Sequence, residues 1–411
     1  MSHAPGSVVM VDPHLEGGVA HYTWALCDAL ARRGTDVTLL TRRGAAYELD
    51  ALPRRFRLRR DLPGVISRPP PGVGQRLRSL VDPTHWDRHL AEILTDVARE
   101  HDSRLLHQQW QLRPPRDPHI WDAARQRRPG VRVIYTAHNV FPHDGSSDAR
   151  ASWSVAHAHP DRIVVHGERL RATGVRDAGM PSTRVDVVPL GNYHFLADAF
   201  AVPDRGEART RLGLDADRAV VLFFGHVRPY KGLDVLLSAL AELVRRGRDV
   251  TLLVAGRVEG GWSGSDLERQ ARSLGLGDAH LRVEDRFLPL EEIAPWFAAS
   301  DLLCAPYHRG SQSGVLQLAY AYRRPVLATR VGSLAEVVLD GETGCTVEPG
   351  APEALADGLD ALLDDRAALA RMGARAREWS ADVFGWDRIA DLTRAVYERA
   401  LADGHGAGEA A

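Results

Sequence analysis

The sequence predicts an α/β protein made of two doubly wound domains, each with a parallel sheet. Short apolar, β-branched runs alternate with stretches of helical periodicity along nearly the whole chain. Such alternation is typical of parallel strands that helices cover on both faces. The alternation is interrupted once, and 411 residues are too many for one ordinary hydrophobic core. We therefore expect two domains of similar size.

The first series of elements begins near the N-terminus. A short strand at residues 7–13 ends in a turn, and a helix follows at 17–34, with Gly34 as its C-cap. The next strand covers residues 36–41. Further strands of this series are predicted at 104–110, 131–139, 161–167 and 185–191.

The interruption is a polar segment at residues 196–218 that contains proline and glycine. We interpret it as a linker, so that one domain covers residues 1–198 and the other covers 199–380. An amphipathic helix is expected near the C-terminus, and the tail at 404–411 is expected to be disordered. The second series has predicted helices at 233–247 and 351–379 and predicted strands at 219–225, 250–256, 280–285, 301–307 and 324–329.

Composition excludes several classes of protein. No run reaches the roughly 18 apolar residues that a membrane span needs, and the N-terminus lacks the pattern of a signal peptide. A net charge of −2 gives no general attraction to nucleic acid. Cys27, Cys304 and Cys345 are too few and too far apart for a disulfide framework or a zinc site. These features predict a cytoplasmic protein.

Residues 52–88 differ from the rest because they are rich in arginine and proline. We interpret them as a solvated, irregular loop. A second interpretation is a mobile acceptor loop, or a peripheral contact with anionic lipid headgroups at the inner membrane face.

Lys231 is the only lysine among the 52 Lys and Arg residues of the chain. It follows a predicted strand and a glycine turn, and a predicted helix begins directly after it. Helix N-termini attract anions, and Arg228 lies three residues earlier on the same turn. An arginine fork and a compact ammonium suit phosphate oxygens. The pair therefore predicts a diphosphate clamp, and the alternative is an ordinary surface lysine.

The first strand-to-helix turn follows the same logic. Gly17 and Gly18 would let a ligand approach the backbone closely just before a helix N-terminus. Ligands of doubly wound sheets bind at the carboxyl ends of strands. We therefore expect this turn to face Arg228 and Lys231 across a cleft between the domains.

These turns lie in segments that resemble the retaining glycosyltransferases of family GT4, which have the GT-B fold. The resemblance covers nearly the whole chain. It implies two Rossmann-like domains with a cleft between them, and within residues 381–411 a crossover helix that packs on the N-terminal domain. The matching segments are EGGVAHYT, TAHNVFPH, FFGHVRPYKGLDVLLSAL, RPVLATRVGSLAEVVLDGETGCTVEPG and FGWDRIADLTRAVYERAL.

The resemblance implies roles for individual residues. Gly17 and Gly18 would line the donor phosphate, and Arg228 and Lys231 would bind the nucleotide diphosphate and stabilise it as it leaves. His138, directly after a strand, matches a histidine near the donor sugar and is a candidate catalytic residue. The implied contacts of the nucleotide base are Arg286, Phe287 and Leu288.

One motif departs from the family pattern, which usually has two glutamates separated by seven residues. Here Ser311, Gln312 and Ser313 occupy the neighbourhood of the first glutamate, and Leu318 or Ala319 that of the second. The donor sugar contacts would then come from residues 311–313, with Gln312 or Ser313 as hydrogen-bond partner in place of a carboxylate. The backbone N–H groups expected to bind phosphate are those of Gly314, Val315 and Leu316.

The implied reaction moves a sugar from a UDP- or GDP-type nucleotide sugar to a hydroxyl acceptor, with retention and by a metal-independent front-face mechanism. No other cofactor is expected. A secondary metabolite, a lipid-linked sugar and a polysaccharide end remain open as acceptors. The rival functions are a phosphorylase or nucleotide-sugar epimerase of the same fold, and a non-catalytic partner that binds a nucleotide sugar. A dinucleotide-dependent redox enzyme ranks low because no G-x-G-x-x-G opens either domain.

Overall fold

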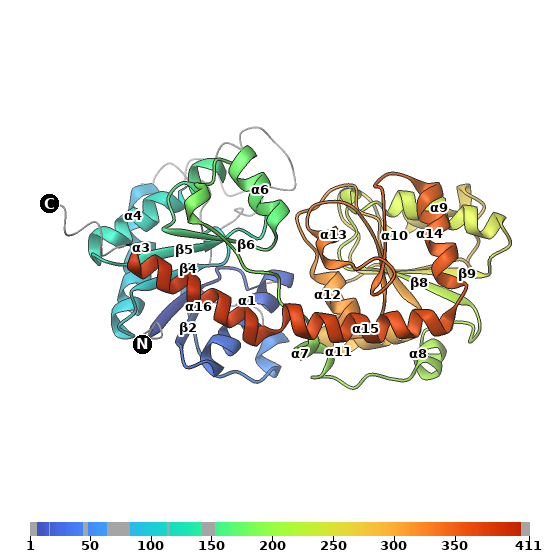
Figure 1. The fold of residues 1–411 in the computed structure, drawn as a ribbon, viewed down its shortest axis with the longest axis horizontal. Coiled ribbons are helices and arrows are strands. Elements are labelled where there is room, and N and C mark those ends of the chain that lie inside the picture. The colour runs from blue at the N-terminus through green and yellow to red at the C-terminus, as the bar shows by residue number, and fades with distance from the viewer. Residues whose placement is uncertain are drawn as a thin grey trace, which may run out of the picture. The chain divides into compact units, whose positions relative to one another are not determined.

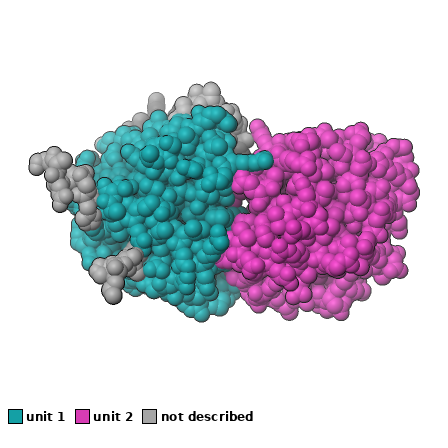
Figure 2. Space-filling model, in the orientation of Figure 1, with its two compact units in different colours: residues 1–191, 386–411 teal, residues 192–385 magenta. Residues whose placement is uncertain are grey.

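The computed structural model describes residues 6–15, 17–43, 48–63, 83–112, 116–141 and 153–403. The chain forms two compact units: unit 1 is residues 1–191 with 386–411, and unit 2 is residues 192–385 (Figure 2). Each unit has one parallel sheet with helices packed on it, as the ribbon shows (Figure 1). The predicted α/β class with two Rossmann-like domains is confirmed. The predicted disordered tail at 404–411 lies outside the described residues.

Unit 1 has a seven-stranded sheet in the order β3-β2-β1-β4-β5-β6-β7, and neighbouring strands pair in parallel. The order reverses between β1 and β4, so the sheet is doubly wound. Its strands are β1 (Ser7–Val11), β2 (Asp36–Arg42), β3 (Arg57–Leu62), β4 (Leu105–Gln108), β5 (Arg132–Thr136), β6 (Arg162–Val165) and β7 (Val185–Val187). Its α-helices are α1 (Gly17–Arg32), α3 (Pro83–Glu100), α4 (Asp117–Arg127), α6 (Glu168–Asp177) and α16 (Trp386–Ala402), with short 3₁₀ turns at Glu48–Ala51 and Ser182–Arg184.

Unit 2 has a six-stranded sheet in the order β10-β9-β8-β11-β12-β13, again parallel and doubly wound. Its strands are β8 (Ala219–Phe224), β9 (Val250–Ala255), β10 (Leu281–Glu284), β11 (Leu302–Ala305), β12 (Val326–Thr329) and β13 (Gly344–Val347). Its α-helices are α7 (His194–Ala197), α8 (Arg205–Arg211), α9 (Leu233–Arg245), α10 (Gly264–Ser273), α11 (Leu290–Ala299), α12 (Gly314–Ala321), α13 (Leu334–Val337), α14 (Pro352–Leu363) and α15 (Arg366–Phe384), and Pro229–Lys231 form a 3₁₀ turn, η3.

The polar segment at 196–218, which the sequence predicts to be a linker, instead belongs to unit 2. Helix α8 lies within it and packs on α11. The segment looks like a linker because charged residues, a proline and two glycines are spread along it. Its central arginine, Arg209, is nevertheless almost completely buried.

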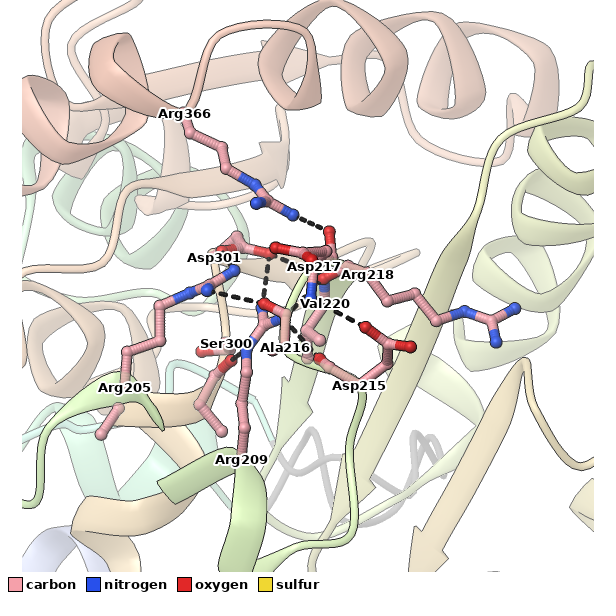
Figure 3. A network of polar contacts seen from close by, with 12 residues as sticks. Arg205, Arg209, Asp215, Ala216, Asp217, Arg218, Val220, Ser300, Asp301 and Arg366 are labelled. Atoms are coloured by element: carbon pink, nitrogen blue, oxygen red, sulfur yellow. Dashed lines mark hydrogen bonds and ion pairs between the residues drawn. The ribbon is translucent and has the colours of Figure 1, made fainter. Parts of the chain in front are cut away.

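Arg209 joins α8 to the amino ends of β8 and β11 (Figure 3). Its guanidinium donates to Asp301 Oδ2 at 3.0 Å, and the same oxygen accepts the backbone N–H of Val220 at 2.8 Å. Asp301 Oδ1 accepts a further bond from Arg205. The backbone carbonyls that also accept bonds from Arg209 belong to Asp215, Ala216, Arg218 and Ala299. The buried charges of Arg209 and Asp301 are therefore paired with each other, and both groups make further hydrogen bonds to the surrounding backbone.

The chain passes between the units twice, after Gly191 and after Gly385. Helix α16 returns to unit 1, where it packs on α1 and β5 (Figure 1). Its first residue, Trp386, lies directly against Gly191, since a β-carbon at Gly191 would lie 2.3 Å from the indole ring. On the side of unit 2, the N–H of Asn192 donates to the carbonyl of Phe384 at 2.9 Å. The two crossing points are thus locally joined.

The interpretation of residues 52–88 as an irregular loop is wrong for residues 57–62, which form β3 at the edge of the sheet beside β2. Charged side chains protect such an edge from pairing with another strand. The described arginines here pair with carboxylates: Arg54 and Arg60 with Asp50, Arg55 with Asp28, Arg57 with Asp36, and Arg59 with Asp61 and Glu100. The interpretation is also wrong for residues 83–88, which begin α3, and residues 64–82 lie outside the described residues.

Within the described ranges, no helix has both the length and the apolar character that a membrane crossing requires.

The Arg209 cluster predicts a sharp difference between two arginines of one helix. Arg209→Ala leaves Asp301 buried with weaker compensation, so the free energy of unfolding should fall by about 3–5 kcal/mol. Arg211→Ala removes only an exposed pair with Glu207, which should cost about 0–1 kcal/mol. Urea unfolding followed by circular dichroism measures both, and equal losses for the two variants would contradict a structural role for the cluster.

Candidate functional site

The carboxyl ends of β8 and β11 lie at the point where the strand order of unit 2 reverses. Ligands of doubly wound sheets bind at such points. The segment after β8 covers residues 225–232, and the segment after β11 covers residues 306–313. They contact each other directly, since the N–H of His308 donates to the carbonyl of Tyr230 at 2.8 Å.

Gly232 fixes how closely these two segments approach. Its φ is +69°, in the left-handed region, and it separates η3 from α9. A β-carbon there would lie 2.0 Å from the carbonyl oxygen of Pro306. Only glycine meets both conditions, so the sequence Lys-Gly holds Lys231 at the N-terminus of α9 and against the β11 segment.

Lys231 is buried, with 8% of its surface exposed. Its Nζ lies 5.6 Å from the ring centroid of Tyr307, the second residue after β11, which is a cation–π distance. Among the described residues, no carboxylate forms an ion pair with this ammonium. Burial lowers the pKa of Lys231 to about 8, helped by Arg228 and opposed by Glu259. The interpretation as an ordinary surface lysine is therefore wrong.

Arg228, the second predicted cation, is about two-fifths exposed. Its Nε donates to Glu259 Oε2 at 2.7 Å, and Glu259 Oε1 lies 2.9 Å from Nδ1 of His226. Glu259 follows β9, and its N–H donates to the carbonyl of Val227. A carboxylate from the neighbouring loop therefore orients the guanidinium of Arg228.

The N-terminus of α12 supplies backbone donors in the same unit. Ser313, the residue before the helix, makes no side-chain cap, so its hydroxyl leaves the first-turn N–H groups of Gly314, Val315 and Leu316 to other partners. That hydroxyl instead lies 3.2 Å from the Tyr307 hydroxyl. A methyl group of Val315 lies near Gly225. The predicted phosphate-binding turn therefore lies close to the turn that carries Lys231.

The structure also shows what stands in place of the two glutamates. Leu318 and Ala319 are both buried in α12, so no carboxylate occupies the second position. Ser311, Gln312 and Ser313 are half-buried just before the helix. In the described part of the chain, no group of three or more His, Cys, Asp or Glu side chains is arranged to hold a metal ion.

The three predicted base contacts follow β10 and have different surroundings. Arg286 pairs with Glu284 and Glu292. Leu288 is buried, whereas Phe287 is 40% exposed, which is unusual for a phenylalanine. Phe287 is therefore the one of these side chains that offers an aromatic face to solvent.

The predicted residues of unit 1 follow β1 and β5. Gly17 and Gly18 begin α1 and are exposed, and Gly17 has a φ of +59°. The turn before them is held by Asp12, whose Oδ1 accepts the N–H of Leu15 and whose Oδ2 accepts the Thr23 hydroxyl, both at 2.8 Å. Burial raises the pKa of Asp12.

His138 lies after β5 and is 3% exposed. Its Nε2 lies 3.2 Å from Gln109 Oε1, and its Nδ1 lies 3.0 Å from Nε2 of His166. Both ring nitrogens therefore already have hydrogen-bond partners within unit 1. A direct bond from either nitrogen to a sugar would have to replace one of them.

The structure thus brings Arg228, Lys231 and the α12 turn together in unit 2, and it places Gly17, Gly18 and His138 in unit 1. Sequence reasoning missed several supporting residues. In the sequence, the residues that were missed share only one feature: each lies directly after a strand or within a few residues of its end. That position does not show which side chains they contact. The missed residues are Asp12, Gln109, His166, Glu259 and Tyr307.

Two family models match the chain. The model described as "Glycosyltransferase Family 4" matches residues 16–191, and the model described as "Glycosyl transferases group 1" matches residues 218–365. Each match lies in one of the two units.

Relatives and solved structures agree with these matches. The D-inositol 3-phosphate glycosyltransferase of Rhodococcus jostii (strain RHA1) is 32% identical, over 96% of this chain and 87% of that protein. Sucrose-phosphate synthase from Thermosynechococcus elongatus has a TM-score of 0.74 at 20% identity, over 97% of this chain and 100% of that one. Anabaena HepE in complex with UDP and glucose has a TM-score of 0.70 at 19% identity, over 96% and 99%. The chain therefore belongs to glycosyltransferase family 4, and it is a glycosyltransferase with the α/β GT-B architecture.

Proposed function

We propose that this glycosyltransferase moves a sugar from a nucleotide diphosphate sugar of the UDP or GDP type to a hydroxyl acceptor, with retention of the anomeric configuration. The observation that carries the proposal is the buried ammonium of Lys231, which forms no ion pair within the described ranges. A buried cation without a counter-ion is costly. A diphosphate bound at the carboxyl end of β8 supplies the missing negative charge.

Two further features of unit 2 support a diphosphate at this place. Arg228 adds a second cation, oriented by Glu259. The first turn of α12 adds backbone N–H groups and the positive end of a helix dipole. In this proposal Phe287 stacks on the nucleotide base, and Ser311, Gln312 and Ser313 contact the donor sugar.

The reaction follows from this arrangement by a front-face mechanism. The acceptor oxygen bonds to the anomeric carbon on the face from which the diphosphate leaves, as the bond between that carbon and the phosphate oxygen breaks. The acceptor proton passes to the leaving phosphate oxygen. Lys231, Arg228 and the α12 turn stabilise the negative charge that develops there, and no step uses a metal or another cofactor.

The comparisons suggest which substrates to try first. HepE was solved with UDP and with UDP-glucose, so UDP-glucose is the first donor. The named activity of the Rhodococcus relative makes an inositol phosphate the first acceptor. Secondary metabolites, lipid-linked sugars and polysaccharide ends follow as further acceptors, and a contact with anionic lipids through residues 52–88 is part of the lipid-linked case.

Incubation of the protein with each donor, with and without acceptors, tests the reaction. We expect an acceptor-dependent product whose anomeric configuration, read by NMR coupling constants, equals that of the donor. An inverted product would exclude retention. A changed donor sugar formed without acceptor would instead indicate an epimerase, and release of a sugar phosphate by inorganic phosphate would indicate a phosphorylase.

Replacing Lys231 tests the diphosphate site. Lys231→Ala should fold normally and lose turnover by about 100- to 1000-fold, because it removes one donor to the leaving group. The matched control is Arg245→Ala at the far end of α9, an exposed cation paired with Glu242. Initial rates at saturating donor decide, and turnover by Lys231→Ala at the rate of the control would disprove the role.

Titration of Lys231 gives an independent test. A bound diphosphate raises the pKa of Lys231 above its ligand-free value of about 8. Below that pH both states carry the proton, so the affinity for UDP should not change through this group. Above it the free protein must take up a proton to bind, so Kd should rise, by up to about tenfold per pH unit.

Isothermal titration calorimetry with UDP measures this dependence, and Lys231→Arg is the matched control because arginine stays charged throughout. A wild-type Kd that follows the same pH dependence as the control would contradict the assignment.

A further inference from the structure

A line of buried polar side chains crosses the carboxyl ends of the strands of unit 1 and reaches α16. We name it the buried polar network: Tyr397, His107, Gln109, His138 and His166. The contacts along it are Tyr397 Oη to His107 Nδ1 at 2.7 Å, His107 Nε2 to Gln109 Nε2 at 3.1 Å, Gln109 Oε1 to His138 Nε2 at 3.2 Å, His138 Nδ1 to His166 Nε2 at 3.0 Å, and His166 Nδ1 to the carbonyl of Val188 at 2.9 Å.

The three rings of this network are buried and uncharged. Burial lowers the pKa of His107 to about 3 and that of His166 to about 4, and it lowers the pKa of His138 well below its ordinary value. The ring of Tyr22 faces both histidines, with its centroid 5.1 Å from that of His138 and 5.0 Å from that of His166. The ring of Trp110 also contacts the ring of His138. Near neutral pH each imidazole therefore carries one N–H.

Neutral rings allow only one direction for the hydrogen bonds. A carbonyl only accepts, so His166 carries its hydrogen on Nδ1 and accepts at Nε2. His138 must then carry its hydrogen on Nδ1, which leaves its Nε2 as an acceptor. Gln109 must therefore present its amide N–H group to His138, with its Oε1 toward His107, whose Nε2 also lies 2.7 Å from the Thr136 hydroxyl.

The opposite orientation of the Gln109 amide requires one more proton. With Oε1 toward His138, that ring donates from Nε2 and accepts at Nδ1. His166 must then donate from both nitrogens, to His138 and to Val188, and becomes an imidazolium. The low pKa values make this form unfavourable near pH 7.

We propose that the Val188 carbonyl, through His166, holds His138 as the neutral Nδ1–H tautomer and that Gln109 is the positioning residue that completes this lock by donating to Nε2, so that His138 orients the donor sugar and takes no part in proton transfer. The proposal deepens the proposed function, on which its kinetic part rests. It agrees with a front-face step in which the leaving phosphate oxygen accepts the proton of the acceptor. His138 is then needed for the shape and dipole of its ring.

Nitrogen-15 NMR of the ligand-free protein, labelled at histidine, measures the lock directly. We expect His138 to show a protonated Nδ1 and an unprotonated Nε2 from pH 5.5 to 8. A protonated Nε2 on His138 in this range would overturn the proposal. This readout does not depend on any substrate.

Gln109→Glu is the informative substitution, because a carboxylate cannot donate to Nε2. His138 should then hold its hydrogen on Nε2, the pair with His166 should take up a proton, and the pH profile of kcat/KM should gain an inflection that the wild type lacks. The KM of the donor should rise by about tenfold or more, with a smaller change in kcat. Gln109→Met, neutral and of similar length, serves if the glutamate variant does not fold: its His138 should keep the Nδ1–H tautomer, because His166 still accepts from Nδ1, but the lost donor to Nε2 should raise the KM of the donor.

Tyr397→Phe is the matched control. It removes a buried hydroxyl at the far end of the network, whereas the tautomer of His138 is set from the Val188 end, so NMR and KM should match the wild type. Wild-type tautomer, KM and pH profile in both Gln109 variants would overturn the proposal. An intact lock in a protein that turns over no nucleotide sugar would instead count against the proposed function alone.

Discussion

The burial of a single ammonium group at the carboxyl end of β8 is the constraint that organises unit 2. Lys231 directly precedes the turn at Gly232, and its ammonium faces the ring of Tyr307. A cation–π contact of this kind contributes about 0.5–2 kcal/mol, less than the cost of removing an ammonium from water. The difference is available to an anion that binds there. Gly232 is explained as the means of keeping that ammonium in place, and the α12 turn as a further set of donors for the anion.

The two units carry different electrostatics. Unit 2 concentrates charge near its strand reversal, with Lys231, Arg228 and Glu259 on neighbouring loops. Unit 1 places uncharged, mutually hydrogen-bonded rings at the corresponding end of its sheet, around His138. Stabilisation of a leaving group needs fixed charge, whereas orientation of a sugar needs fixed donors and acceptors. The division of labour in the proposed reaction follows from this difference.

Sequence periodicity was sufficient to predict the two sheets, and strand-to-helix turns were sufficient to place Arg228, Lys231 and the α12 turn after neighbouring strands of unit 2. These features depend on neighbours in the sequence. Residues 196–218 and 57–62 were misinterpreted because tertiary pairing, which composition does not show, buries Arg209 and turns an arginine-rich stretch into an edge strand. Gln109 and Glu259 were not predicted for the same reason, because each contacts a site residue that is distant in the sequence: Gln109 contacts His138, and Glu259 contacts Arg228. The loss of the glutamate pair was visible in the sequence, but its surroundings were not.

The return of α16 to unit 1 has a consequence for biosynthesis. Trp386 packs against Gly191 and Tyr22, and Tyr397 reaches His107, so the earlier part of unit 1 lacks these groups until α16 has been made. Translation proceeds from the N-terminus, and domains generally fold as they emerge. Unit 1 therefore leaves the ribosome first but is completed only after unit 2 has been made. A nascent polypeptide that ends before α16 would leave exposed the apolar residues of unit 1 that this helix covers, and chaperones bind such surfaces.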